Sequence, residues 1–200
     1  MKIFLTGGSG YIGGAIRDHL AGHAIYAPTH TEWPVDRPSA YMAGDFDALI
    51  LAHGTLGKVG LFKDLKARDW LHALDVNLFG TLSLIQSAPE GCRIIVLLGG
   101  GTFAHPCLSG YFAAKSALRA MVPALASEDY KIVGIAPGPQ PSRMIREALA
   151  SRGAAPIEPI LRDIIEGKTV VPIGRTLSII DEVLDPTFND WGQVFIARDR

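Results

Sequence analysis

The sequence is poor in cysteine, in net charge and in long apolar runs, and each absence excludes a class of protein. Its two cysteines, Cys92 and Cys107, are too few for a disulfide framework. A net charge of −1 and a pI of about 6.6 give no field that would attract nucleic acid or an anionic membrane. No apolar run approaches the ~18 residues of a membrane span, and no signal-peptide pattern precedes the first run. We therefore expect a cytoplasmic protein that acts on a small molecule, with neither nucleic acid nor a membrane as partner.

Short apolar runs recur at wide spacing and predict the strands of a sheet. They lie at residues 3–5, 23–27, 48–52, 94–98, 132–136 and 194–197. Continuous Val/Ile/Leu runs are typical of parallel strands, and their alternation with helix-length segments indicates right-handed βαβ units. We therefore expect one Rossmann-type α/β domain over residues 1–200, with a doubly wound parallel sheet in a three-layer α/β/α arrangement. Residues 29–44 are short and weakly periodic, so the second βαβ unit should shrink to a short strand and a helical turn.

Two predicted helices are apolar on more than one side. In residues 70–86 the stripe comprises Leu71, Leu74, Leu78, Leu82 and Ile85. In residues 109–126 it comprises Leu118, Met121, Val122 and Leu125. A helix that is apolar nearly all round is usually buried on more than one side. Either each helix is pressed between the sheet and its neighbours, or the two pair with symmetry mates around Leu78 and Leu118.

A glycine pattern, Gly8-x-Gly10-x-x-Gly13, follows the first predicted strand and opens a helix at residues 11–20. Glycines there allow a tight turn and a close approach of the backbone to a pyrophosphate. The charge of the pyrophosphate faces the amides and the positive end of the helix dipole. The pattern predicts a dinucleotide site, and the alternative is a merely structural turn.

A tyrosine and a lysine stand four residues apart in the predicted helix 109–126. Residues at this spacing share a helix face, so the Lys115 ammonium can lie beside the Tyr111 phenol. Ionising a free tyrosine at neutral pH costs roughly 4 kcal/mol, and an adjacent cation lowers that cost. We therefore expect Lys115 to lower the pKa of Tyr111, so that the phenol can exchange a proton with a substrate.

The tip of the second strand bears on the choice of cofactor. A carboxylate there would hydrogen-bond the ribose diol of NAD, and a basic group would accommodate the extra phosphate of NADP. The strand runs into Pro28-Thr29-His30-Thr31, with neither a carboxylate nor an arginine, and Glu32 lies just beyond. The tip slightly favours NADP, and NAD stays an open alternative.

Taken together, these motifs resemble the short-chain dehydrogenase/reductase family nearly from end to end. Residues 46–54 resemble its fourth strand and Asn-Ala-Gly turn, with Ala52 and His53 in place of the usual Asn and Ala. Residues 75–80 resemble its central helix with the catalytic asparagine, here Asn77. Tyr111 and Lys115 match the catalytic pair, and residues 135–142 match the loop that follows the sixth strand.

The resemblance implies an NAD(P)-dependent enzyme that interconverts a carbonyl and an alcohol by hydride transfer. Tyr111 would move the proton, and Lys115 would lower its pKa and hold the nicotinamide ribose. Asn77 would hold a water in a proton relay, although it could instead bond a neighbouring backbone carbonyl. Ser142 would bind the nicotinamide carboxamide.

The expected catalytic residues are Asn77, Thr102, Tyr111 and Lys115. The expected cofactor-binding residues are Gly7, Ser9, Gly10, Tyr11, Ile12, Gly13, Asp36, Ala52, His53, Gly54, Asn77, Tyr111, Lys115, Pro137, Gly138 and Ser142. No metal site is expected, because His53 and His105 have no second ligand at a suitable spacing. The substrate site should lie at the carboxyl edge of the sheet, with residues 143–159 where the family places a lid. The resemblance also implies a homodimer or homotetramer.

The sequence departs from the family before the tyrosine. The family's serine or threonine falls here in Leu97-Leu98-Gly99-Gly100-Gly101, which holds no hydroxyl. Leu98 is the nominal position of the family's hydroxyl residue. Losing one such donor would cost on the order of 3 kcal/mol of transition-state stabilisation, unless Thr102 or backbone amides replace it. A weakly catalytic redox sensor is therefore an alternative.

The spacing of the glycines in the turn differs from that of the family's classical branch. Its form, Gly7-x-x-Gly10-x-x-Gly13, resembles the family's extended branch of nucleotide-sugar epimerases and dehydratases, whereas the rest of the chain resembles the classical branch. The chain is too short for the substrate domain of the extended branch, which favours a single-domain reductase.

Overall fold

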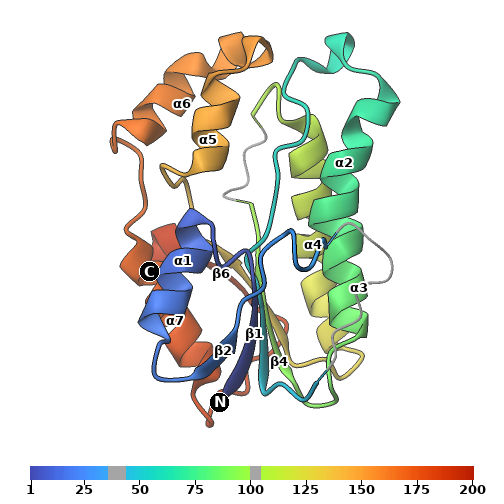
Figure 1. The fold of residues 1–200 in the computed structure, drawn as a ribbon, viewed down its shortest axis with the longest axis vertical. Coiled ribbons are helices and arrows are strands. Elements are labelled where there is room, and N and C mark those ends of the chain that lie inside the picture. The colour runs from blue at the N-terminus through green and yellow to red at the C-terminus, as the bar shows by residue number, and fades with distance from the viewer. Residues whose placement is uncertain (36–43, 100–104) are drawn as a thin grey trace.

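A computed structural model describes residues 1–35, 44–99 and 105–200, and these residues form one α/β domain. Its six-stranded parallel sheet has the order β2-β1-β3-β4-β5-β6 (Figure 1). The strands are β1 (Lys2–Thr6), β2 (Ala24–Tyr26), β3 (Ala48–Leu51), β4 (Arg93–Leu97), β5 (Ile132–Ala136) and β6 (Val194–Ile196). The doubly wound Rossmann-type fold expected from the apolar runs is confirmed.

Helices cover both faces of the sheet. They are α1 (Tyr11–His19), α2 (Leu71–Leu74), α3 (Gly80–Gln86), α4 (Ser109–Ala126), α5 (Arg143–Leu149), α6 (Glu158–Ile165) and α7 (Ile173–Leu184). Helices α1 and α7 lie on one face, and α2, α3 and α4 lie on the other (Figure 1). Helices α5 and α6 stand beyond the carboxyl ends of the strands, which places them over the edge where we expect the substrate site.

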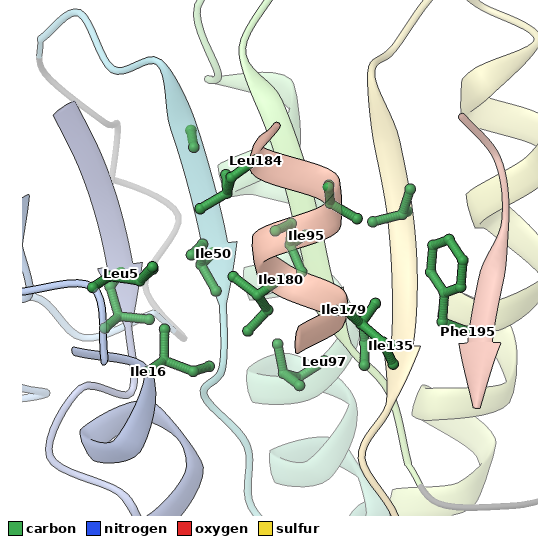
Figure 2. Close-up of a cluster of buried hydrophobic side chains, with 14 of the residues drawn as sticks. Leu5, Ile16, Ile50, Ile95, Leu97, Ile135, Ile179, Ile180, Leu184 and Phe195 are labelled. Carbon is green, nitrogen blue, oxygen red and sulfur yellow. The ribbon is translucent and has the colours of Figure 1, made fainter. Parts of the chain in front are cut away.

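Two apolar clusters, one on each face, bury the sheet. Alternate strand residues point to opposite faces, so Leu5 packs toward α1 and α7 while Phe4 packs toward α3 and α4. On the first face, Ile179 and Ile180 of α7 lie over the strand side chains (Figure 2). All five residues of β5 are buried, as expected for a central parallel strand.

The segment after β2 contains no strand among its described residues, 29–35. Thr29 and Glu32 instead form reciprocal hydrogen bonds that begin a turn. The Trp33 ring then packs edge-on against Phe4, with 4.4 Å between the ring centroids. This segment therefore covers β1 with side chains, and the expected short strand is not found there. Residues 36–43 lie outside the described part of the chain.

The apolar helix predicted over residues 70–86 is helical throughout but irregular. After the 3₁₀ turn η2 (Ala67–Trp70) and helix α2 comes a π-helical turn, η3 (Asp75–Phe79), which leads into α3. The buried face comprises Ala73, Val76, Asn77, Gly80, Thr81, Leu84 and Ile85. The predicted stripe is wrong in its first half, because Leu71 is 54% exposed. Small and polar side chains face the core there.

Leu118 of α4 is 2% exposed and belongs to the core, together with Val122. The core interpretation therefore holds for the Leu118 face of α4, and the pairing of these helices with symmetry mates stays a prediction. The large apolar side chains left exposed nearby are Phe62, Leu71 and Phe79.

Glycine is required where the turn after β1 meets β3 and α1. Gly7 has a φ of +68°, and a Cβ there would lie 2.7 Å from the backbone carbon of Ala52. A Cβ on Gly13 would lie 2.0 Å from the Gly7 carbonyl oxygen. The start of α1 is therefore held against the carboxyl end of β3 by contact between backbones.

This geometry predicts opposite effects for two neighbouring glycines of α1. Gly13→Ala forces a methyl group onto the Gly7 carbonyl and should lower the free energy of unfolding by at least about 1–3 kcal/mol. Gly14→Ala is the matched control, because its Cβ would meet only the Gly8 oxygen, at 3.7 Å. It should leave stability unchanged or raise it by up to about 1 kcal/mol. Urea unfolding of both variants measures the difference, and equal stabilities would contradict the close packing of Gly13.

Candidate active site

A cavity of about 340 Å³ opens at the point where the strand order reverses. The chain leaves β1 toward β2 on one side, and β3 lies on the other, so the carboxyl ends of β1 and β3 flank a crevice. Doubly wound sheets bind ligands at this place. The start of α1, the end of β3, helix α4 and the loop after β5 all reach the cavity.

The floor of the cavity is the first turn of α1. Gly10 precedes this helix with extended backbone, and no side chain caps the helix start. The first turn also lacks an acidic residue, so the positive end of the helix dipole is not offset. Ser9, Tyr11 and Ile12 line the cavity beside it. This arrangement suits an anion such as a pyrophosphate.

Tyr111 and Lys115 of α4 lie on the opposite wall and flank Gly99. A Cβ on Gly99 would lie 3.2 Å from the Lys115 Cβ and 3.3 Å from the Tyr111 hydroxyl oxygen. Lys115 is buried, and its Nζ donates a hydrogen bond to the Leu97 carbonyl at 2.8 Å. The tyrosine and the lysine therefore share one site, as the sequence predicted.

Burial sets the pKa values of this pair. Burial raises the pKa of Tyr111 to about 12 and lowers that of Lys115 to about 8. The expectation that Lys115 lowers the pKa of the phenol is wrong for this structure, because burial is the dominant effect and the ammonium is turned to Leu97. Tyr111 is therefore a protonated donor at neutral pH.

Gly99 lies against the Tyr111 ring, and Leu98 lines the same cavity as Tyr111. Leu98 is 4% exposed and packs toward Gly134 of β5, where its Cδ1 would lie 2.6 Å from an added Cβ. Leu98, the nominal family position, lines the cavity with a side chain that carries no hydroxyl, so its assignment stays a prediction. The hydroxyl has no counterpart at Gly99, where the tyrosine ring fills the space next to the backbone. Thr102, the other candidate, lies outside the described residues.

Asn77 is fully buried, and its side chain bonds backbone groups. Its Nδ2 donates to the carbonyls of Thr55 and Ala73, both at 2.8 Å, and its Oδ1 accepts from the Thr55 amide at 3.0 Å. This is the structural alternative left open for Asn77. The asparagine holds the loop after β3 against the π-helical turn, and it lies behind the cavity wall instead of lining it.

His53 joins three elements through its ring. Thr81 Oγ1 donates to the Asn77 carbonyl at 2.9 Å, so it can only accept from His53 Nε2, at 3.1 Å. Nε2 therefore carries the proton, and Nδ1 accepts the Thr6 hydroxyl at 2.7 Å. Burial lowers the pKa of His53 to about 3, so the ring is neutral. It fixes the end of β3 between β1 and η3.

The loop after β5 supplies the last wall. Gly138 has a φ of +77°, and Ser142 begins α5 by accepting the Ile145 amide at 3.4 Å. Gln140, which sequence reasoning passed over, is 4% exposed and donates from Nε2 to the Val171 carbonyl at 2.8 Å. The sequence feature that could have identified Gln140 is an amide side chain between two prolines, Pro139 and Pro141.

Most of the predicted cofactor residues meet at the cavity. Those lining it are Ser9, Gly10, Tyr11, Ile12, Gly13, Ala52, His53, Gly54, Tyr111, Lys115, Pro137, Gly138 and Ser142. Gly7 lies behind it in the turn, and Asp36 lies outside the described residues. The apolar lining from α4, α5 and α6 was not predicted, because nothing in those side chains distinguishes a cavity wall from a core.

Comparison with known proteins supplies a family match. Residues 35–152, more than half of the chain, match the family model described as short chain dehydrogenase. An uncharacterized oxidoreductase of Schizosaccharomyces pombe is 26% identical over 102 residues. That alignment covers 48% of this chain and 41% of the relative, so it spans well under half of the relative's length.

Solved structures share the fold. A small-chain dehydrogenase in complex with NADPH is 14% identical, with a TM-score of 0.76 over 98% of this chain and 95% of that one. A 3-ketoacyl-(acyl-carrier-protein) reductase from Brucella melitensis, complexed with NADH, is 15% identical, with a TM-score of 0.78 over the same shares. At these identities the likeness shows the fold alone. None of the helices in the described parts of the chain has the length and hydropathy needed to cross a bilayer.

His53 should make the stability of the fold depend on pH. Its folded pKa of about 3 lies below the ordinary value of 6.5 that the unfolded chain keeps. Below pH 6.5 the unfolded state therefore binds a proton that the folded state excludes. The free energy of unfolding then falls as the pH drops, by up to about 1.4 kcal/mol per unit. Urea unfolding at a series of pH values between about 7.5 and about 5 should show this fall, mainly below pH 6.5.

The His53→Asn variant should lose most of the pH dependence. His72→Asn is the matched control, because the His72 side chain is exposed and its removal should leave the slope as in the wild type. A slope that persists in His53→Asn would assign the effect to another group.

Proposed function

Because the chain belongs to the short-chain dehydrogenase family, we propose that it is an NAD(P)-dependent oxidoreductase that interconverts a carbonyl and an alcohol on a small organic substrate. The observation that carries the proposal is the cavity at the switch point. The uncapped start of α1 forms one side of this cavity, and Tyr111 with Lys115 forms the other. A ligand anchored by its phosphates at α1 can therefore extend to the acid–base pair.

The residues present fit a nicotinamide dinucleotide. Gly10 and Gly54 line the cavity without side chains, and Gly54 packs so closely on Asn77 that a Cβ there would lie 2.9 Å from its Oδ1. The backbone amides of Tyr11 and Ile12 would hold the pyrophosphate, and Ser142 and Lys115 would hold the nicotinamide end. When bound, the cofactor supplies or accepts the hydride.

Tyr111 carries the proton in this proposal. With its pKa raised to about 12, the phenol keeps its proton at neutral pH and can donate it to a carbonyl oxygen as hydride arrives at carbon. Lys115 holds its own proton at pH values below about 8, and its Nζ, which donates to the Leu97 carbonyl, lies on the same wall as Tyr111. The burial of both groups thus supports the direction of reduction.

No side-chain hydroxyl stands at Gly99 to hold the substrate oxygen. Thr102 remains the candidate for this contact, and the backbone amides of the glycine run are the alternative. If neither reaches the oxygen, catalysis weakens by roughly 3 kcal/mol, and the chain serves as a cofactor-binding redox sensor. Gly99 is the one observation that favours this second function.

NADPH is the cofactor we infer for the reduction. Both hydrogen bonds of the Glu32 carboxylate go to Thr29, which leaves this acid engaged in a turn at the tip of β2. Both of these bonds end on Oε2 of a carboxylate that points back to Thr29, whereas the hydroxyl-rich tip tolerates a phosphate. We also infer a cytoplasmic homodimer or homotetramer, in keeping with the apolar side chains that α2 and η3 leave exposed.

Gly10→Val tests the cofactor site. Its branched side chain should enter the space of the pyrophosphate and raise the dissociation constant for NADPH by about tenfold or more in calorimetry. A Cβ on Gly10 would lie 3.2 Å from the Gly7 carbonyl oxygen, so the turn must shift by a few tenths of an ångström, and urea unfolding checks that the variant is folded. Gly14→Ala, one turn further into the helix, is the control and should bind as the wild type does. Wild-type affinity in Gly10→Val would overturn the assignment.

Tyr111→Phe tests the proton transfer. Removing the hydroxyl should lower turnover of a carbonyl substrate by about 100-fold or more while NADPH affinity changes little. In the wild type, kcat/KM for reduction should fall as the pH rises through about 8, where Lys115 loses its proton. Lys115→Arg keeps its charge and should lack that fall. Wild-type turnover in Tyr111→Phe would remove the mechanism.

A further inference from the structure

The part of the cavity beyond Tyr111 has hydrocarbon walls. Its lining includes Leu56, Leu108, Phe112, Met144, Ile157 and Leu161. Most of these side chains also belong to one apolar cluster, which joins α4, α5 and α6. A ligand bound there loses its contacts with water and contacts apolar side chains on nearly every side.

No charged side chain at this end is placed to pair with a charge on the ligand. Within the described lining, the cations are Lys115 and Arg143. Lys115 donates to the Leu97 carbonyl, and the Arg143 side chain is 90% exposed and pairs with Glu147 at 3.3 Å. His105 adds one imidazole, beside the Phe112 ring. An ionised substrate group would therefore lose its hydration without a fixed counter-ion.

The segments that form the apolar end of the cavity are in contact through their backbones, and this limits the size of the ligand. Gly153, in the 3₁₀ turn η4 (Arg152–Ile157) between α5 and α6, packs directly on the loop after β3. A Cβ there would lie 2.0 Å from the Val59 carbonyl oxygen. The Gly60 amide of that loop in turn donates to the Cys107 carbonyl at 2.9 Å. The covering helices therefore rest on backbone contacts.

We propose that the substrate is an uncharged, mostly hydrocarbon ketone of compact shape, such as an aryl or alicyclic ketone, or the matching secondary alcohol. The inference rests on the proposed function. Hydride passes from NADPH to the carbonyl carbon, the proton of Tyr111 passes to the carbonyl oxygen, and Tyr111 regains a proton from solvent. The ketone is reduced, and NADPH is oxidised to NADP⁺. The single polar group of such a substrate lies at Tyr111, and its hydrocarbon part lies against the apolar walls.

A matched set of ketones tests the proposal. The neutral compound is 4-methylacetophenone, and the anionic and cationic counterparts are 4-acetylbenzoate and (4-acetylphenyl)trimethylammonium. At pH 8, above the ordinary range in which imidazole titrates, kcat/KM with NADPH should be at least about 100-fold higher for the neutral compound. Comparable or better use of either charged ketone would overturn the proposal.

Binding is measured separately with NADP⁺, which allows no reduction. Calorimetric binding of 4-methylacetophenone without turnover under NADPH would support the apolar site and overturn the proposed oxidoreductase function. Turnover of all three ketones alike would support the function and overturn the substrate class. Absence of binding by the neutral ketone would overturn the substrate class.

Ile160 of α6 provides the matched variants, because it lines the cavity and is 38% exposed, so a polar side chain is tolerated. Ile160→Lys should raise the ratio of kcat/KM for 4-acetylbenzoate over 4-methylacetophenone by about tenfold or more. Ile160→Gln, which is polar but uncharged, should leave this ratio within about threefold of the wild type. An unchanged ratio in Ile160→Lys would show that the apolar wall does not select the substrate.

Discussion

The contact between the glycine turn and the end of β3 is the constraint on which the site depends. Gly7 and Gly13 have no side chains, so the start of α1 approaches the backbone of Ala52 directly. The loop after Ala52 is held in turn by Asn77 and His53, which connect it to η3. The glycine turn, the loop after β3 and η3 are therefore joined by backbone contacts and buried hydrogen bonds on one side of the cavity.

The pKa values of Tyr111 and Lys115 are both set by burial in the same part of the cavity wall. Low polarity favours the neutral form of each group, so it raises the pKa of Tyr111 and lowers that of Lys115. Burial therefore separates the two pKa values, to about 12 for Tyr111 and about 8 for Lys115, so the phenol keeps its proton at a pH where the lysine loses its own.

The sequence predicts the sheet, the glycine turn and the Tyr111–Lys115 pair, because each depends on local periodicity or on spacing within one element. It does not predict which residue of the glycine run faces the tyrosine, since that depends on where β4 ends and on how Leu98 packs against Gly134. The pKa of Tyr111 was predicted with the wrong sign, because spacing reveals a neighbouring charge but not the depth of burial. The apolar walls were missed for a similar reason, as a cavity is a property of the assembled elements.

The π-helical turn η3 changes which residues of the segment from α2 to α3 lie on its buried face. Its buried positions repeat every four residues, at Asn77, Thr81 and Ile85, with Ala73 one step earlier. On an ideal α-helix of 3.6 residues per turn, such a repeat drifts by about 40° at each step. The wider turn absorbs that drift and returns the four side chains to one side. A helical wheel drawn at a constant 100° per residue therefore rotates the inner face outward, and it places Leu71 in a stripe that the molecule leaves in solvent.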